Sequence, residues 1–410
     1  MKTILKNIIV AAFAAVCLPA FATENQDAQQ EVQLTYRRPS LCSFLVSRAD
    51  QKMYDRIQSQ YLEILAPDQY NDHNLSIRVL NVSKKGQYKD SIADWLDRNG
   101  VASRLVAKWF NRDMLTGKCS LDLVKQRGLY NASAMERELA SRSNRGKAML
   151  EDAGEDLIGN TFVLVHEAHY IDNEQRGKNV ATGLKIGGAL LGAFLGSGVS
   201  DLFDTFGDMA ATIKGFRVKF HTTLYRLVWD DQTAGTFYQQ MYAAEPNSAK
   251  KEAFERGRGN FRLEYVGEVE SSGSQNSFLG INEEHPEIMI RKACCRAIDD
   301  NIADLQRNFE SFRVRSPIAG VDEDGTVKVA IGMKEGINKD SEYEVLEPQE
   351  KDGVIKYKRV GVIAPIEGKI WDNRYMASEE GAVGADLAAT SFKVKSGSTP
   401  YMGLLVRQIK

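Results

Sequence analysis

Net charge of either sign is almost absent from this chain of 410 residues, which holds 53 basic and 55 acidic residues. Proteins that bind nucleic acids usually carry a basic excess or a basic patch, so this balance argues against a nucleic-acid partner. The apolar share of 43% is ordinary for a globular protein. A chain of this length is expected to form two domains that can bury a full core.

Motifs that carry catalysis or hold cofactors are also scarce. The sequence has no G-x-x-x-x-G-K-[ST] phosphate loop, no G-x-S-x-G nucleophile elbow and no cysteine spacing typical of zinc. Its densest group of possible ligands is His166-Glu167-Ala168-His169. A zinc protease needs its histidines four residues apart on a helix, whereas these are three apart in a predicted strand. We therefore expect that the protein binds no metal or cofactor and is not an enzyme. The alternative is a hydrolase whose active site includes these histidines or His221.

Cysteines are few, and one of the five, Cys17, lies in a predicted leader. The others are Cys42, Cys119, Cys294 and Cys295. Adjacent cysteines rarely bond to each other, so Cys42–Cys119 is the expected disulfide in an exported protein. The alternative is that all four are small buried apolar residues.

Residues 1–22 have the form of a Sec-type signal peptide. Two lysines precede a short apolar stretch, and small residues stand before the expected cleavage point. The stretch is too short to span a membrane as a helix, and Val16 before Cys17 disfavours a lipoprotein. Removing the leader changes the formal charge from −2 to −4, and its form predicts export to the periplasm or outer envelope.

Four segments follow the leader. Residues 23–38 are polar and aperiodic, so we expect a flexible lead-in. Residues 39–315 mix predicted strands and helices and form the expected α/β body. Proline, glycine and acids over 316–325 predict a linker, and short strands separated by turn residues over 326–410 predict a small all-β barrel or sandwich. The expected fold class is therefore α+β, a mixed α/β body with a helical-hairpin insertion followed by a small β-domain.

Hydrophobic patterns place the elements of these domains. Strands are predicted over 41–47, 75–82, 161–172, 216–229, 261–269 and 277–280, and in the C-terminal domain over 326–332, 341–347, 355–365, 367–373, 390–394 and 404–409. Helices are predicted over 53–64, 92–97, 102–110, 120–125, 132–140 and 145–157, and from Pro286 onward. This last helix has a buried stripe at Cys295, Ile298, Ile302, Leu305 and Phe309.

A glycine-rich segment interrupts the body at residues 180–214. Gly188, Gly192 and Gly196 recur at every fourth position and would form one smooth stripe on a helix. We expect a helical hairpin there. The glycine stripe would have one of three roles: it would pack against another part of the same chain, form a contact between copies in an oligomer, or insert into a membrane. An uncharged run of about fifteen residues is shorter than the 20 or so that a spanning helix needs.

Three stretches give the chain its broadest resemblance to known proteins. Residues 148–165, 216–229 and 368–382 look like members of a large group of uncharacterised secreted proteins from Gram-negative anaerobes. The similarity covers most of the mature chain, and it implies export but no activity.

Two further resemblances concern single domains. The stretch GMKEGI at 332–337, followed by EYEV at 342–345, resembles the small β-domain of the flagellar assembly protein T family. The body is loosely similar to the curli-secretion channel family, which implies a membrane-directed insertion. That family carries a lipobox and β-hairpin insertions, whereas this chain lacks the first and its insertion is predicted to be helical.

These observations together favour a non-enzymatic envelope protein that acts by binding or assembly. The expected partner is an unknown protein or a second copy of the chain, with a possible membrane contact. One alternative is an oligomeric secretion or pore-like component that uses the glycine-rich segment. A hydrolase is the second alternative.

Overall fold

The computed structural model describes residues 38–48, 51–81, 88–130, 134–142, 154–172, 214–277, 286–351 and 354–410. The predicted leader and lead-in lie outside these ranges, apart from Arg38. So do Gly188, Gly192 and Gly196 and nearly all of the predicted hairpin, whose last residue, Lys214, instead begins a strand.

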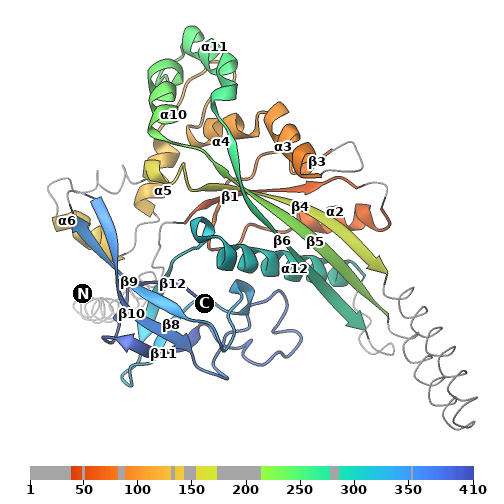
Figure 1. The fold of residues 1–410 in the computed structure, drawn as a ribbon, viewed down its shortest axis with the longest axis vertical. Coiled ribbons are helices and arrows are strands. Elements are labelled where there is room, and N and C mark those ends of the chain that lie inside the picture. Colours follow the sequence, from red (N-terminus) through yellow and green to blue (C-terminus); the bar gives the residue numbers. More distant parts are fainter. Residues whose placement is uncertain are drawn as a thin grey trace, which may run out of the picture.

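A six-stranded sheet organises the body. Its strands are β1 (Ser40–Val46), β2 (Asn71–Asp72), β3 (Val79–Leu80), β4 (Thr161–Asp172), β5 (Lys214–Leu227) and β6 (Leu263–Ser277). Their order is β2-β1-β4-β5-β6, and β3 also pairs with β1. Strands β1 and β4 are parallel, whereas β4, β5 and β6 form an antiparallel meander (Figure 1).

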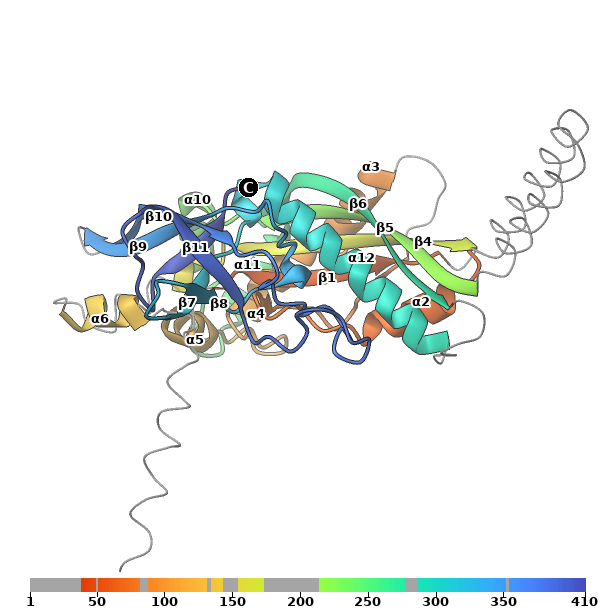
Figure 2. The same ribbon diagram turned by 90° about the horizontal axis from the view of Figure 1, so that it is seen from below.

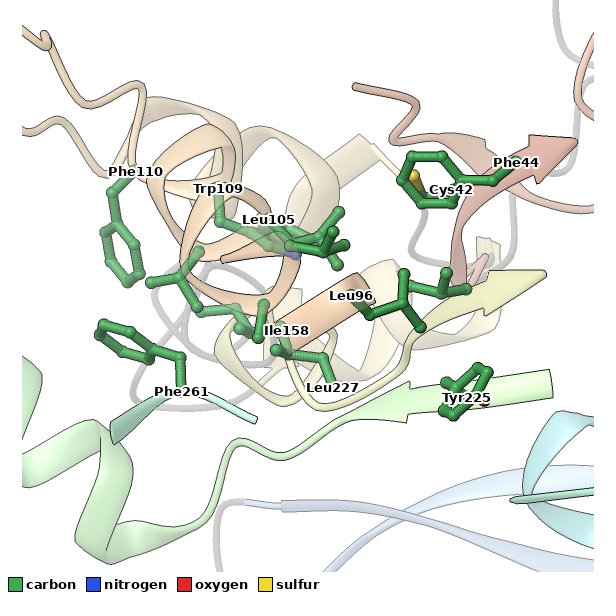
Figure 3. Packing of buried hydrophobic residues seen from close by; sticks show 14 of the residues in the cluster. Cys42, Phe44, Leu96, Leu105, Trp109, Phe110, Ile158, Tyr225, Leu227 and Phe261 are labelled. Carbon is green, nitrogen blue, oxygen red and sulfur yellow. The ribbon is translucent and has the colours of Figure 1, made fainter. Parts of the chain in front are cut away.

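One face of this sheet is covered by α3 (Tyr88–Arg98), α4 (Val101–Trp109) and α5 (Asp122–Tyr130). A small lobe adjoins them, made of α10 (Asp231–Thr236), the π-helical turn η1 (Phe237–Met241) and α11 (Ser248–Arg256). Large aromatic side chains fill the space between, and Figure 3 shows Trp109 and Phe110 of the α4 region in this cluster. Burial of this apolar area is the main force that fixes the helices.

The opposite face is covered by α2 (Tyr54–Leu62) and by the long helix α12 (Pro286–Asn308). Figure 2 shows α12 lying across β5 and β6. Because helices cover both faces, β1 is buried on both: Cys42 and Phe44 join one core, and Leu41 and Leu45 join the other.

The C-terminal unit is a closed barrel with the strand order β10-β11-β8-β7-β12-β9. Its strands are β7 (Ser316–Val321), β8 (Val327–Val329), β9 (Tyr343–Lys351), β10 (Val354–Pro365), β11 (Thr390–Gly397) and β12 (Leu405–Gln408). Inward-facing residues such as Val329, Ile363 and Phe392 form its core. Closure pairs both edges of the sheet and so removes them.

Ion pairs and a short turn join the barrel to the body. The 3-10 turn η4 (Met333–Glu335) lies against α12. Glu380, in the loop between β10 and β11, pairs with Lys292 at 3.2 Å and with Arg296 at 2.6 Å, both on α12. Helix α6 (Ala134–Arg142) contacts β9 of the barrel.

The predicted fold class is confirmed at this level: a mixed α/β body precedes a small β-barrel.

The prediction of a linker over 316–325 is wrong in its first part, since 316–321 is barrel strand β7. The polar residues that suggested a linker form the β7–β8 turn, where Gly325 donates a hydrogen bond to Asp322. No strand forms at 367–373. The strand expected over 261–269 continues to Ser277 as β6, and 278–280 of the next expected strand lie outside the described residues. None of the helices within the described ranges is long and apolar enough to cross a bilayer.

Candidate functional site

A cleft of about 480 Å³ opens between the α3–α4 turn and the segment that leads into β6. We call it the arginine cleft. It is lined by Leu96, Asp97, Arg98, Asn99, Gly100, Val101, Ala102, Arg104, Arg258, Gly259, Phe261 and Arg262. Its volume lies in the range of ordinary small-molecule sites.

The first wall is the turn that links α3 to α4. Gly100 has a φ of 57°, in the left-handed region that favours glycine, and its N–H donates to the Asp97 carbonyl. The turn places Arg98 at the end of one helix and Arg104 in the first turn of the next. Helix α4 begins without a side-chain cap, so its first N–H groups keep the partial positive charge of a helix N-terminus.

The second wall is the 3-10 turn η2 (Arg258–Asn260) with the two residues that follow it. Phe261 is buried in the same aromatic cluster as Leu96 of α3 (Figure 3). Its ring lies 5.5 Å from that of Phe254 on α11. This buried ring anchors the chain between Arg258 and Arg262, which both line the cleft.

Charge in the cleft is strongly unbalanced. Four arginines and one acidic residue, Asp97, line it, and all five are exposed. Arg258 forms an ion pair with Glu255 of α11. Within the part of the chain that the structure describes, Arg98, Arg104 and Arg262 have no ion pair. Arg98 Nε donates to the Asp94 carbonyl at 3.2 Å. Hydrogen bonds from Thr233, with the charge of Arg262, lower the pKa of Asp230. An anion in the cleft would be attracted by all four arginines, so the cleft is suited to bind an anionic group.

The lining of the cleft is rich in groups that bind anions. Among the residues described there, Asp97 is the one carboxylate, and no histidine, cysteine, serine, threonine or tyrosine is present. Arginine stays protonated at physiological pH and offers five N–H donors in a planar fork. Such groups recognise phosphate and carboxylate oxygens but do not exchange protons with a substrate.

His166 of the predicted ligand cluster is a core residue. Its Nδ1 lies 2.8 Å from Thr222 Oγ1, and Asn301 donates to the same hydroxyl at 2.7 Å. Burial, with a contribution from Arg78, lowers the pKa of His166 to about 3. The ring is therefore neutral, and its hydrogen bond orients it as a structural histidine.

His169 and His221 lie on the other face of the sheet. Gln51 approaches the His169 ring at 3.2 Å, and His221 Nε2 is 3.7 Å from Glu268. Glu167 lies on the same face. Burial raises the pKa of the Glu167 carboxyl, and the nearby His221 acts in the opposite direction. The described ranges contain no group of three or more His, Cys, Asp or Glu side chains placed to hold a metal. The structure thus separates His166 from His169.

Cys42 and Cys119 are both buried free thiols, so the predicted disulfide does not form in this structure. Cys42 lies on β1 inside the apolar core (Figure 3), and burial raises its pKa to about 12. The Cys119 thiol donates to the Gly117 carbonyl at 3.6 Å. Both behave as small buried side chains, as the alternative interpretation expected.

The arginine cleft itself was not predicted, because overall charge balance conceals a local cluster. Its signal is readable in the stretches RNGVASR at 98–104 and RGRGNFR at 256–262, each basic and interrupted by glycine. The two stretches are more than 150 residues apart. Only the fold brings them to one cleft.

Comparison with known proteins leaves the chain without an assigned family. No protein-family model matches it, and no curated protein matches it. The resemblances to secreted, flagellar and curli-secretion families therefore stay predictions.

Proposed function

We propose that this protein is an exported, non-enzymatic envelope protein that acts by binding, and that the arginine cleft recognises an anionic group of its ligand. The observation that carries the proposal is the convergence of Arg98, Arg104, Arg258 and Arg262 on one cleft. The form of residues 1–22 supports the export part of the proposal.

The predicted helical hairpin at 180–214 belongs to this proposal as a second contact surface. Its glycine stripe would pack within the chain, against another copy or against a membrane. Anion binding at the cleft does not depend on which of these holds, because the cleft is built from α3, α4, η2 and the two residues that follow η2.

Binding is tested by thermal unfolding of the mature protein with phosphate, pyrophosphate, sulfate and citrate at constant ionic strength. A ligand at about 100 times its Kd stabilises the folded state by about 2.7 kcal/mol. We expect at least one of these anions to raise the Tm, and the double variant R104Q/R262Q to lose that rise.

The matched control is R256Q. Arg256 ends α11, is 76% exposed and pairs with Glu252 outside the cleft. It corrects for salts such as sulfate, which stabilise proteins by exclusion from their surfaces. An equal rise in wild type and both variants, or no rise with any anion, would contradict the proposal.

Export is tested separately. The full chain is produced in a Gram-negative host, the periplasmic fraction is isolated and the mature N-terminus is read by mass spectrometry. We expect a protein that begins at Thr23. A cytoplasmic protein that keeps residues 1–22 would refute the export part and leave anion binding standing.

A further inference from the structure

We infer that the anion bound in the arginine cleft is a phosphate monoester carried on a hydroxylated body, as in a sugar phosphate. This inference rests on the proposed function and names the ligand class of the same cleft. Three features of the cleft carry it: the number of its guanidinium groups, its size, and the acceptor beside the arginines.

The first feature is the count of donors. One arginine fork satisfies a carboxylate, which is planar and carries a single charge. Here four arginines come from both walls of the cleft, and three of them lack an ion pair within the described ranges. A phosphate monoester brings up to two charges and three terminal oxygens, which point in different directions and can meet donors from both walls.

The uncapped start of α4 adds to this complementarity. Its first-turn N–H groups belong to Val101 and its neighbours, and Val101 and Ala102 both line the cleft. Helix N-termini favour phosphate because their N–H groups and dipole act together. The guanidinium groups supply the net charge, and the helix start supplies neutral donors.

The second feature is size. The cleft measures about 480 Å³, which is in the range of sites for small organic molecules. Free phosphate has five heavy atoms and would leave most of this space to water. The bound group is therefore expected to be attached to a larger body that shares the cleft.

The third feature concerns the nature of that body. Asp97 and Asn99 line the cleft beside the arginines. A carboxylate only accepts hydrogen bonds, and it would repel a second anionic group. Hydroxyl groups donate hydrogen bonds and carry no charge, so Asp97 fits the hydroxyls of a sugar or polyol.

The test is isothermal titration calorimetry of the mature protein. The probes are glucose 6-phosphate, glycerol 3-phosphate, inorganic phosphate, glucose, citrate and an oligonucleotide without a terminal phosphate. We expect at least one of the two esters to bind more tightly than the other four probes. Loss of one charge-assisted contact weakens binding about tenfold or more, so R104Q/R262Q should weaken it about a hundredfold, and R256Q should leave it unchanged.

Two further arms address the phosphate and the hydroxylated body. The second ionisation of a monoester has a pKa of about 6, so affinity should fall severalfold from pH 7.5 to pH 5.0, where the ester is mainly a monoanion. D97N should lower the affinity for the ester relative to that for inorganic phosphate. Inorganic phosphate thus serves as the internal reference for the lost negative charge.

The outcomes separate the inference from the proposed function. If citrate or the oligonucleotide binds more tightly than both esters, and R104Q/R262Q weakens that binding, anion recognition stands and the phosphate-monoester inference is overturned. An unchanged ester-to-phosphate ratio in D97N overturns the hydroxylated body. If no probe binds, or if binding is indifferent to R104Q/R262Q, both proposals fail.

Discussion

Two buried histidines illustrate how single residues are held in the body. The Nδ1 of His73 accepts a hydrogen bond from Arg127 at 3.0 Å, so its Nε2–H donates to the Leu105 carbonyl, also at 3.0 Å. Burial and the charge of Arg127 lower the pKa of His73 to about 3, and burial lowers that of His166 to a similar value. Both rings must gain a proton when the chain unfolds in acid.

We expect these histidines to make the protein less stable as pH falls. Their pKa is about 6.5 in the unfolded chain and about 3 in the folded one. The stabilising difference is therefore fully present above pH 6.5 and is lost as pH falls toward 3. Each histidine contributes a slope of about 1.4 kcal/mol per pH unit in that range, which urea unfolding between pH 7.5 and 4.5 can measure.

The variant H166N isolates one of the two contributions. Asn keeps an acceptor toward Thr222 and does not titrate, so the slope should be shallower by about 1.4 kcal/mol per pH unit. Burial raises the pKa of Asp299 to about 7, so this group changes stability with pH in the opposite direction to the histidines. Because Asp299 is present in both proteins, its contribution cancels when the slope of H166N is subtracted from that of wild type. Parallel slopes for wild type and H166N would contradict this assignment.

Among the elements, α12 packs closely against β6. A Cβ at Gly273 of β6 would overlap the Ala293 carbonyl oxygen of α12, and one at Gly267 would overlap the ring of Phe309. Small residues therefore bring a helix close to a strand in the described structure. The predicted stripe at Gly188, Gly192 and Gly196 would use the same principle.

The variant G273A tests this contact. The added methyl group must displace backbone atoms of α12, so we expect a loss of about 1–3 kcal/mol in unfolding free energy. G320A is the matched control, since Gly320 also lies in a strand but a Cβ there would meet nothing within 4 Å. A loss as large in G320A would show that strand glycine itself, and not the approach of α12, sets the cost.

Periodicity predicted the long elements well and the irregular ones poorly. Strand β4 has the predicted bounds, and Ile298, Ile302 and Leu305 of α12 are buried as expected. In place of Cys295, however, Cys294 enters this core. The α3–α4 turn and η2 show no period, and their basic, glycine-interrupted stretches do not reveal that the two meet in one cleft.

At the scale of the whole molecule, α12 serves both units. One side packs on the sheet, and the other carries Lys292 and Arg296, which hold Glu380 of the barrel loop. The Lys292 side chain is fully buried, and burial of a charge is costly without partners. The joint between body and barrel is therefore polar and specific.

We expect E380Q to loosen this joint. Neutralising the carboxylate removes one charged partner from Lys292 and from Arg296, at a cost of roughly 2 kcal/mol. The loop between β10 and β11 should then be cut faster in limited proteolysis. E379Q is the control, because Glu379 is exposed and adjacent; equal cleavage of the two variants would contradict the role given to Glu380.

The two-unit plan could be predicted because composition changes along the chain, from mixed elements to short strands. The closed barrel and its start at Ser316 could not, because closure depends on which distant strands pair. Charge behaves in the same way. A balanced total still allows four arginines to meet at one cleft.

The most direct test of anion recognition at the arginine cleft is residue-resolved modification by phenylglyoxal, which reacts with exposed arginines, read by mass spectrometry. The mature protein is treated alone, with glucose 6-phosphate and with citrate. We predict that at least one of the two anions slows modification of Arg98, Arg104 and Arg262 severalfold while Arg256 reacts at its original rate. If neither anion protects these residues, or if Arg256 is protected equally, the cleft is not the binding site.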